Sequence, residues 1–262
     1  MKKISKFILY IYIVLLIFAG IDLIFTSFRQ NYPWPNLILA NYSLRSYNYL
    51  LKDKKFMVGL FNSLSIGLCS SLLSLIMSIP LAKKLYYKQK AFKMISFLVF
   101  LPFLIGATSI GLGLQLFFKQ MGFAGSKILI IICQCLLIIP YEVRIIRPAY
   151  SFLGDNIIYA GKMLGASDSN IRKEIIFPIL APFIKTALIM GFILSISDYY
   201  LTLVLGSGLV ETFMTVAFPF FVSRDRAISS TISILFLLIN IIFIIIVEII
   251  FRLIFRSKKW TL

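Results

Sequence analysis

Residues 159–182, YAGKMLGASDSNIRKEIIFPILAP, form a polar interval between two long apolar segments. The interval contains glycines and a Pro-x-x-x-Pro spacing, and both features interrupt regular helices. A helix crosses the hydrocarbon of a bilayer with about 20 predominantly apolar residues, and segments of roughly this kind lie on both sides. The interval is therefore predicted to connect two transmembrane helices outside the lipid.

The composition assigns the whole chain to the membrane class. Of 262 residues, 60% are hydrophobic and 14% are charged, whereas soluble proteins are about half apolar and about one quarter charged. The chain has no histidine, which excludes histidine-based catalysis and histidine metal sites. Its net charge of +17 does not indicate nucleic acid, because the basic residues flank apolar segments instead of forming a solvated stripe.

We predict an all-α, polytopic integral membrane protein with six transmembrane helices, because the alternating ten-residue strands of an outer-membrane barrel are not visible. The fourth segment is the shortest, and Pro140 is predicted to bend its inner end. The first segment resembles a signal peptide in its basic start, but its apolar run is longer and no cleavage site follows. It is therefore read as an uncleaved span. The six apolar segments are 7–28, 56–82, 94–118, 128–143, 179–205 and 228–255.

The distribution of basic residues sets the predicted orientation. With the amino terminus inside, the cytosolic segments hold 18 Lys and Arg residues and the external segments hold 9. This asymmetry agrees with the positive-inside rule. Both termini and the interval 159–182 are therefore predicted to be cytosolic.

Local signals predict that the interval forms a helical hairpin. A first helix over 156–164 would close at Gly165, which can adopt the left-handed conformation. Ser167 is a good N-cap for a second helix, and Pro178 would end or kink that helix as the fifth span begins. The apolar residues of the first helix share a face at helical spacing: Ile157, Ala160, Gly161 and Leu164. Such a hairpin is either a docking element for a partner groove or a tie between two spans.

The spacing of the interval resembles a known motif. Tyr159-Ala160-Gly161, three residues, Gly165, nine residues and Ile175-x-Phe177-Pro178 resemble the EAA loop of permease subunits of binding-protein-dependent ABC importers. That family's pattern is Glu-Ala-Ala, three residues, Gly, nine residues and Ile-x-Leu-Pro, so Tyr159 replaces the family's glutamate. Further segments are similar to the family, namely IPYEVRIIRPAY at 139–150, FNSLSIGL at 61–68, GLGLQL at 111–116 and SDYYLTLVLGSG at 197–208. The last is similar to the polyamine, iron, thiamine, sulfate and phosphonate branch.

The resemblance implies a domain organisation. Residues 1–55 would hold the first transmembrane helix and an external segment with the stiff Pro33-Trp34-Pro35 stretch. Residues 56–255 would form the permease core, with a cytosolic coupling loop at 155–178, and residues 256–262 a basic cytosolic tail. The loop residues expected to contact the ATPase are Tyr159, Ala160, Gly161, Leu164, Gly165, Ala166, Ser167, Ile175, Phe177 and Pro178.

The resemblance also implies partners and a location. The partners would be a cytosolic ABC ATPase dimer, a second permease that is homologous or identical, an external solute-binding protein and membrane lipid, without nucleic acid. The chain has no G-x-x-x-x-G-K-[ST] motif, so ATP and Mg are expected on the ATPase, with no cofactor and no enzymatic activity on this chain. The location would be the inner (cytoplasmic) membrane of a bacterium.

Asp198 is the clearest candidate for a translocation-path residue, together with Ser195 and Tyr199. An ionisable group in a span costs about 2.5–3.5 kcal/mol on insertion scales and is a functional candidate by default. The alternative is a structural residue paired with another helix. On the functional reading the solute would be small and polar or cationic, with a polyamine favoured.

Other polar residues are predicted to be structural. The small residues of 61–74 are expected to pack helices together, and Glu142, beside Arg144 and Arg147, is expected at a solvated cytosolic helix end. The Cys133-x-Cys135 pair is expected to be buried and apolar in character. No catalytic arrangement and no metal cluster is evident.

Two further classes stay open at this point: an integral-membrane enzyme acting on lipid, and a membrane scaffold or insertion factor. The enzyme would require clustered His, Asp or Glu, and the chain has no His and only 10 acids. Co-purification of an ATPase would separate the importer from both alternatives.

Overall fold

The computed structural model describes residues 2–30, 41–87, 93–122, 125–223 and 225–255. The expected Pro33-Trp34-Pro35 stretch and the tail 256–262 lie outside these residues. The part of the chain that is described consists of helices and one isolated β-bridge between Arg29 and Tyr42. The all-α fold predicted from composition is confirmed.

Three long helices form the centre of the molecule: α3 (Lys54–Tyr87), α6 (Lys127–Met163) and α8 (Phe177–Ser197). They approach closely because small residues lie where they meet. A Cβ atom on Gly191 of α8 would lie 3.2 Å from the Cβ of Ser71 on α3 and 3.1 Å from Ile138 on α6. The prediction that the small residues of 61–74 pack helices is confirmed, since Ser63, Ser70, Ser71 and Ser74 are buried.

Five helical segments are long and apolar enough to cross a membrane: Ile8–Ser27, Lys54–Tyr87, Lys127–Gly154, Asp168–Ser197 and Arg226–Ile254. They correspond to the first, second, fourth, fifth and sixth predicted spans. The fourth is longer than predicted. It stays helical through Pro140 and Pro148 and breaks at Gly154, where φ is 55°, because glycine tolerates the left-handed region that other residues avoid.

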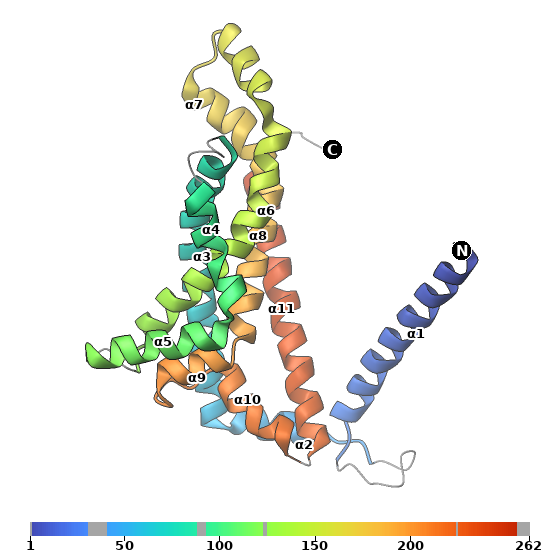
Figure 1. Cartoon of the computed structure of the whole chain (residues 1–262). Helices are drawn as coiled ribbons and strands as arrows, with labels where there is room; N and C mark the ends of the chain where they lie inside the picture. Colours follow the sequence, from blue (N-terminus) through green and yellow to red (C-terminus); the bar gives the residue numbers. More distant parts are fainter. Residues whose placement is uncertain (1, 31–40, 88–92, 123–124, 224, 256–262) are drawn as a thin grey trace.

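The third predicted span is not one helix, and that prediction is wrong. The segment divides into α4 (Lys93–Ile105) and α5 (Ala107–Gln120) at Gly106, whose φ of 80° breaks the helix. Each half extends about 20 Å, which is less than the roughly 30 Å of hydrocarbon. Together they carry the chain back from the end of the bundle near α7 to the end near α9 (Figure 1).

Short helices cover the end of the bundle near α9. They are α2 (Arg45–Lys52), α9 (Tyr200–Gly206) and α10 (Phe213–Val222). The predicted fifth span, 179–205, is therefore too long at its outer end, because α8 stops at Ser197 and a new helix starts two residues after Asp198. On α10, Phe213 packs against Phe56 of α3 with ring centroids 5.5 Å apart.

Helix α1 (Lys2–Ser27) leaves the bundle and joins it only near its end (Figure 1). There Thr231 Oγ1 of α11 (Arg226–Phe255) donates to the Ser27 carbonyl at 3.2 Å. Apolar side chains from Ile8 to Phe25 are exposed along the rest of α1. This helix therefore has an apolar surface that only lipid or another chain can cover.

Candidate functional site

A helical hairpin projects beyond one end of the bundle (Figure 1). Its first arm is the last part of α6, which changes direction at Gly154 and ends at Met163. Its second arm is α7 (Asp168–Ile171) followed by a π-helical turn, η1 (Arg172–Ile176), which runs directly into α8. The hairpin therefore connects α6 to α8, two of the three central helices.

The turn of the hairpin closes by the Schellman pattern. The N–H of Ala166 donates to the Gly161 carbonyl at 3.0 Å, and the N–H of Gly165 donates to the Lys162 carbonyl at 2.9 Å. Gly165 has a φ of 79°, and the Ser167 hydroxyl accepts from the Asn170 N–H at 3.3 Å. The predicted left-handed glycine and N-cap are both confirmed.

The two arms contact each other through Gly161, which is buried. A Cβ atom there would lie 3.4 Å from Ile171 and 3.5 Å from Ile175 of the opposite arm. The other members of the predicted apolar face, Ile157, Ala160 and Leu164, are exposed, so of these four residues only Gly161 is buried against the opposite arm.

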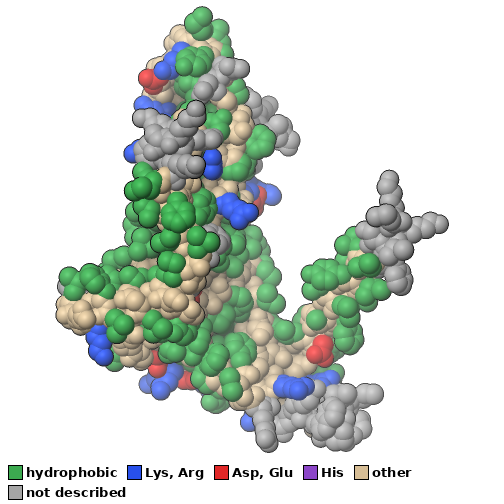
Figure 2. Space-filling view, in the orientation of Figure 1, with side chains coloured by type: hydrophobic (Ala, Val, Ile, Leu, Met, Phe, Trp, Pro, Cys, Tyr) green, Lys and Arg blue, Asp and Glu red, His purple; other side chains and the backbone are tan. Residues whose placement is uncertain are grey.

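The tip of the hairpin exposes large apolar side chains. Tyr159 is 66% exposed, Met163 90% and Leu164 88%, and an ion pair of 3.1 Å between Lys162 and Asp168 lies beside them. Figure 2 shows hydrophobic and charged side chains together at this end of the molecule. An exposed apolar patch with a polar rim is typical of a protein contact site. The remaining predicted loop residues are Ala166, partly buried, Phe177, exposed, and Pro178, partly buried.

Pro178 does not end the second arm. The helix continues through it into α8, and the π turn over Arg172–Ile176 immediately precedes it. A proline removes one backbone donor, and a widened turn is a common local adjustment to such a disruption. The second arm and α8 are therefore continuous, so the hairpin is joined to the core without a flexible linker.

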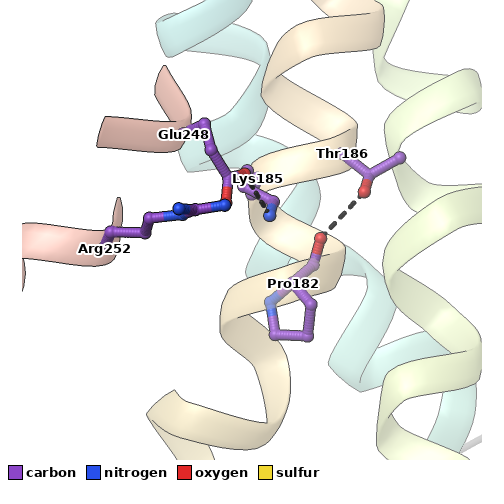
Figure 3. Close-up of polar contacts among 5 residues, drawn as sticks. All are labelled: Pro182, Lys185, Thr186, Glu248 and Arg252. Carbon is purple, nitrogen blue, oxygen red and sulfur yellow. Dashed lines mark hydrogen bonds and ion pairs between the residues drawn. The ribbon is translucent and has the colours of Figure 1, made fainter. Parts of the chain in front are cut away.

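An ion-pair network ties the start of α8 to α11. Lys185 Nζ lies 2.7 Å from one carboxylate oxygen of Glu248, and Arg252 Nε lies 2.8 Å from the other (Figure 3). One turn of α8 is further held by Thr186 Oγ1, which donates to the Pro182 carbonyl at 2.9 Å. The helix that continues from the second arm of the hairpin is thus joined to α11.

A chain of polar side chains crosses the interior of the bundle. Ser70 of α3 donates to the Ser195 hydroxyl of α8 at 3.0 Å, and the Ser195 hydroxyl donates to Gln134 of α6. Gln134 in turn donates to Thr202 at 3.2 Å and to Asp198 at 3.3 Å. These hydrogen-bonded side chains border a cavity of about 140 Å³. Its lining includes Gln134, Tyr141, Ser195 and Asp198.

Asp198 has a structural as well as a cavity-lining position. Its carboxylate accepts from the N–H groups of Leu201 at 3.4 Å and Thr202 at 3.2 Å, so it caps the first turn of α9. Of the three predicted path residues, Ser195 and Asp198 meet at the cavity. Tyr199 instead stacks on Phe218 of α10, with centroids 4.2 Å apart.

Sequence reasoning missed two interior polar residues. Gln134 lies in an apolar run and could have been found as a polar group within a span. Glu142 was expected at a solvated helix end, but it is fully buried and accepts hydrogen bonds from Ser74 and Ser78, each at 2.8 Å. The expectation failed because α6 extends beyond Glu142 to Gly154, which keeps the carboxylate inside the bundle.

Metal-ligating side chains do not gather in the described residues: no group of three or more His, Cys, Asp or Glu occurs there. The two neighbouring thiols, Cys133 and Cys135, are buried, as expected for small apolar side chains.

Long apolar helices around a polar interior, with a hairpin outside the bundle, define a multi-pass helical membrane protein. Residues 70–256 match the family described as the binding-protein-dependent transport system inner membrane component. The chain belongs to this family and is a permease subunit of an ABC-type importer of the inner membrane.

Three similar proteins illustrate the relationship. The spermidine/putrescine transport system permease protein PotC homolog of Mycoplasma genitalium is 29% identical over 221 residues, covering 80% of this chain and 76% of the relative. A putative 2-aminoethylphosphonate transport system permease protein, PhnV of Salmonella typhimurium, is 25% identical over 175 residues, 66% of each chain. A bacterial ABC transporter involved in the import of the acidic polysaccharide alginate shares the fold, with a TM-score of 0.71, 14% identity and coverage of 98% and 96% of the two chains.

Proposed function

We propose that the hairpin 155–178 docks on a separate cytosolic ATPase and couples ATP hydrolysis to movement of the spans. The observation that carries this proposal is the exposed tip formed by Tyr159, Met163 and Leu164. The basic residues predict that the hairpin is cytosolic, and lipid does not cover a patch there. An exposed apolar tip in water gains stability by entering a groove on a partner protein.

The transmission route follows from the connections of the hairpin. A force on the tip acts on α6 at the Gly154 break and on α8 through a continuous helix. The Lys185–Glu248 ion pair then passes the movement to α11. Rocking of these three helices would open the polar interior alternately to the two sides of the membrane.

Tyr159 takes the place of the glutamate in the family's motif. Its ring is 66% exposed, so both the ring and the hydroxyl are available to a partner. A tyrosine of this kind packs in a groove and donates or accepts a hydrogen bond. We propose that packing replaces a charge contact at this position.

The docking role is tested with Gly165→Asp in the assembled transporter. Asp at a φ of 79° strains the turn by about 1 kcal/mol and places a charge beside the exposed tip. We expect loss of solute uptake and weaker co-purification of the ATPase.

The matched control is Gly208→Asp. Gly208 has a φ of 73° and, like Gly165, would have no neighbour within 4 Å of an added Cβ atom, but it lies beyond α9 at the other end of the bundle. Gly208→Asp should leave ATPase co-purification intact. Equal co-purification in the two variants would contradict docking through the hairpin and would favour the hairpin as a tie between two spans.

We further propose that this chain forms half of the solute pathway, with a second permease, an external solute-binding protein and an ATPase dimer that binds ATP and Mg. The unpacked apolar surface of α1 supports a second permease subunit, because it offers contact area that this chain does not use. Crosslinking from a cysteine at Ile13 to the second permease would support this assignment, and crosslinks to lipid alone would count against it.

For the solute, we propose a small cation such as a polyamine. Ser195 and Asp198 line the interior cavity, and no Lys or Arg occurs among the described residues that line it. Spermidine, putrescine and 2-aminoethylphosphonate, the solutes in the relatives' names, all carry an amine, which suits a carboxylate.

Asp198→Asn keeps a side-chain oxygen that can accept from the first turn of α9 but removes the charge. We expect a raised KM for a cationic solute with the amount of folded protein unchanged. Normal uptake kinetics in this variant would remove Asp198 from the pathway.

A further inference from the structure

A second pocket lies away from the polar interior, between α3, α4 and α6. Its volume is about 370 Å³, more than twice that of the interior cavity at about 140 Å³. Two guanidinium groups, two aromatic rings, a proline and a hydroxyl line it: Tyr86, Phe100, Arg144, Arg147, Pro148 and Ser151.

The basic side of the pocket is built on one face of α6. Arg144, Arg147 and Ser151 follow one another at spacings of three and four residues, which places them on one helical face. Within the described part of the chain, neither guanidinium takes part in any of the ion pairs. Glu142, the acidic residue nearest to them in sequence, accepts instead from hydroxyls of α3. Two like charges one turn apart repel each other, and an anion between them would relieve that repulsion.

The other sides of the pocket are apolar and aromatic. The ring of Tyr86 is held by stacking on Tyr150, with centroids 6.4 Å apart and an angle of 25° between the planes. Phe100 of α4 and Pro148 of α6 complete a wall without charge. A ligand that fits both sides therefore carries an anionic group and an apolar portion.

The position of this pocket along the helices corresponds to the predicted cytosolic side of the membrane. Arg147 lies seven residues before Gly154 on α6, which is about 10 Å along the helix. Tyr86 lies in the last turn of α3, just after the exposed Lys83 and Lys84. The basic-residue distribution predicts this end of the bundle to be cytosolic. Basic pockets between transmembrane helices on that side bind phosphate-bearing lipid head groups.

We propose that this pocket binds an anionic glycerophospholipid of the cytosolic leaflet. Arg144 and Arg147 hold the phosphate group by charge-assisted hydrogen bonds. Tyr86 and Ser151 offer hydroxyl donors beside it, and Phe100 and Pro148 contact the start of an acyl chain. The bound lipid fills the space between α4 and α6 just before the hairpin.

The test uses the full chain in phosphatidylcholine nanodiscs titrated with phosphatidylglycerol, with bound lipid counted by native mass spectrometry. Arg144→Gln/Arg147→Gln should weaken phosphatidylglycerol binding about tenfold or more, as expected for loss of hydrogen bonds to a charged group. Tyr86→Phe keeps the ring stacking and removes only the hydroxyl, so a smaller loss is expected with the fold intact.

The charge-matched control is Lys83→Gln/Lys84→Gln, which removes two positive charges from the same end of the bundle outside the pocket lining. This control should retain the bound lipid. Equal losses in the Arg and Lys variants would assign the effect to general surface charge and overturn the site. Inorganic phosphate that binds as tightly as phosphatidylglycerol would assign the pocket to a free anion and overturn the lipid assignment.

Discussion

Gly191 is the position where a single methyl group tests the packing of the three core helices. A Cβ atom there would lie 2.7 Å from Glu142 Oε1, 3.1 Å from Ile138 Cγ2 and 3.2 Å from Ser71 Cβ. The carboxylate is not free to move aside, because Ser74 and Ser78 hold it at 2.8 Å each. Overpacking of this kind costs about 1–3 kcal/mol, while Ala gains about 0.5–1 kcal/mol over Gly in a helix.

Gly191→Ala should therefore destabilise the chain by up to about 2.5 kcal/mol, which corresponds to a fall in Tm of up to about 10 °C for a chain of this size. The assay heats the purified full chain in detergent and follows reaction of a thiol-specific fluorophore with Cys133 and Cys135. Both thiols are buried in the folded state. Cys69 is exposed and is replaced by Ser beforehand to remove the background.

The control for Gly191→Ala is Gly113→Ala in α5, where a Cβ atom would have no neighbour within 4 Å. This variant gains helix propensity without a clash, so its Tm should stay level or rise. A Gly191→Ala protein as stable as Gly113→Ala would refute the close approach of α3, α6 and α8 around Glu142.

Three further substitutions test other parts of the fold. Lys185→Gln should lower the Tm slightly, because it breaks a partly exposed ion pair to Glu248, whereas Lys185→Arg should keep the Tm; equal Tm values for the two variants would contradict the α8–α11 ion pair. Gly106→Ala should destabilise by about 1–2 kcal/mol, because the φ of 80° is strained for alanine, whereas a stabilised variant would indicate a continuous third span. Phe192→Ala removes a fully buried ring stacked on Phe243 at 3.7 Å and should cost about 3–5 kcal/mol; a change below about 1 kcal/mol would show that Phe192 is not in the core.

The sequence predicted the elements whose signals are local. The lengths of the apolar runs located five of the spanning segments. Gly165 and Ser167 located the turn of the hairpin, because a left-handed glycine and an N-cap serine affect only the backbone next to them. Contacts between residues that lie far apart in the sequence were harder to predict. Gly106 was read as a helical glycine like Gly113, although Pro102 precedes it by four residues, so the broken third segment was missed.

The polar interior illustrates the same limit. Asp198 was found because a carboxylate in a span is conspicuous, but its capping of α9 depends on a helix break that hydropathy does not show. Glu142 was misplaced because the length of α6 beyond Pro140 was underestimated. Its partners, Ser74 and Ser78, lie on another helix, 68 and 64 residues away in sequence.

The coupling role of the hairpin is tested most directly by cysteine labelling at its tip. Leu164→Cys is placed in a background without Cys69, Cys133 and Cys135, and Leu209→Cys, 77% exposed and three residues beyond the end of α9, serves as the matched position. In intact cells a membrane-impermeant maleimide should label position 209 and spare position 164, and a short bifunctional maleimide should crosslink position 164 to the ATPase. Labelling of position 164 from outside, or crosslinks from it only within its own chain, would contradict the account.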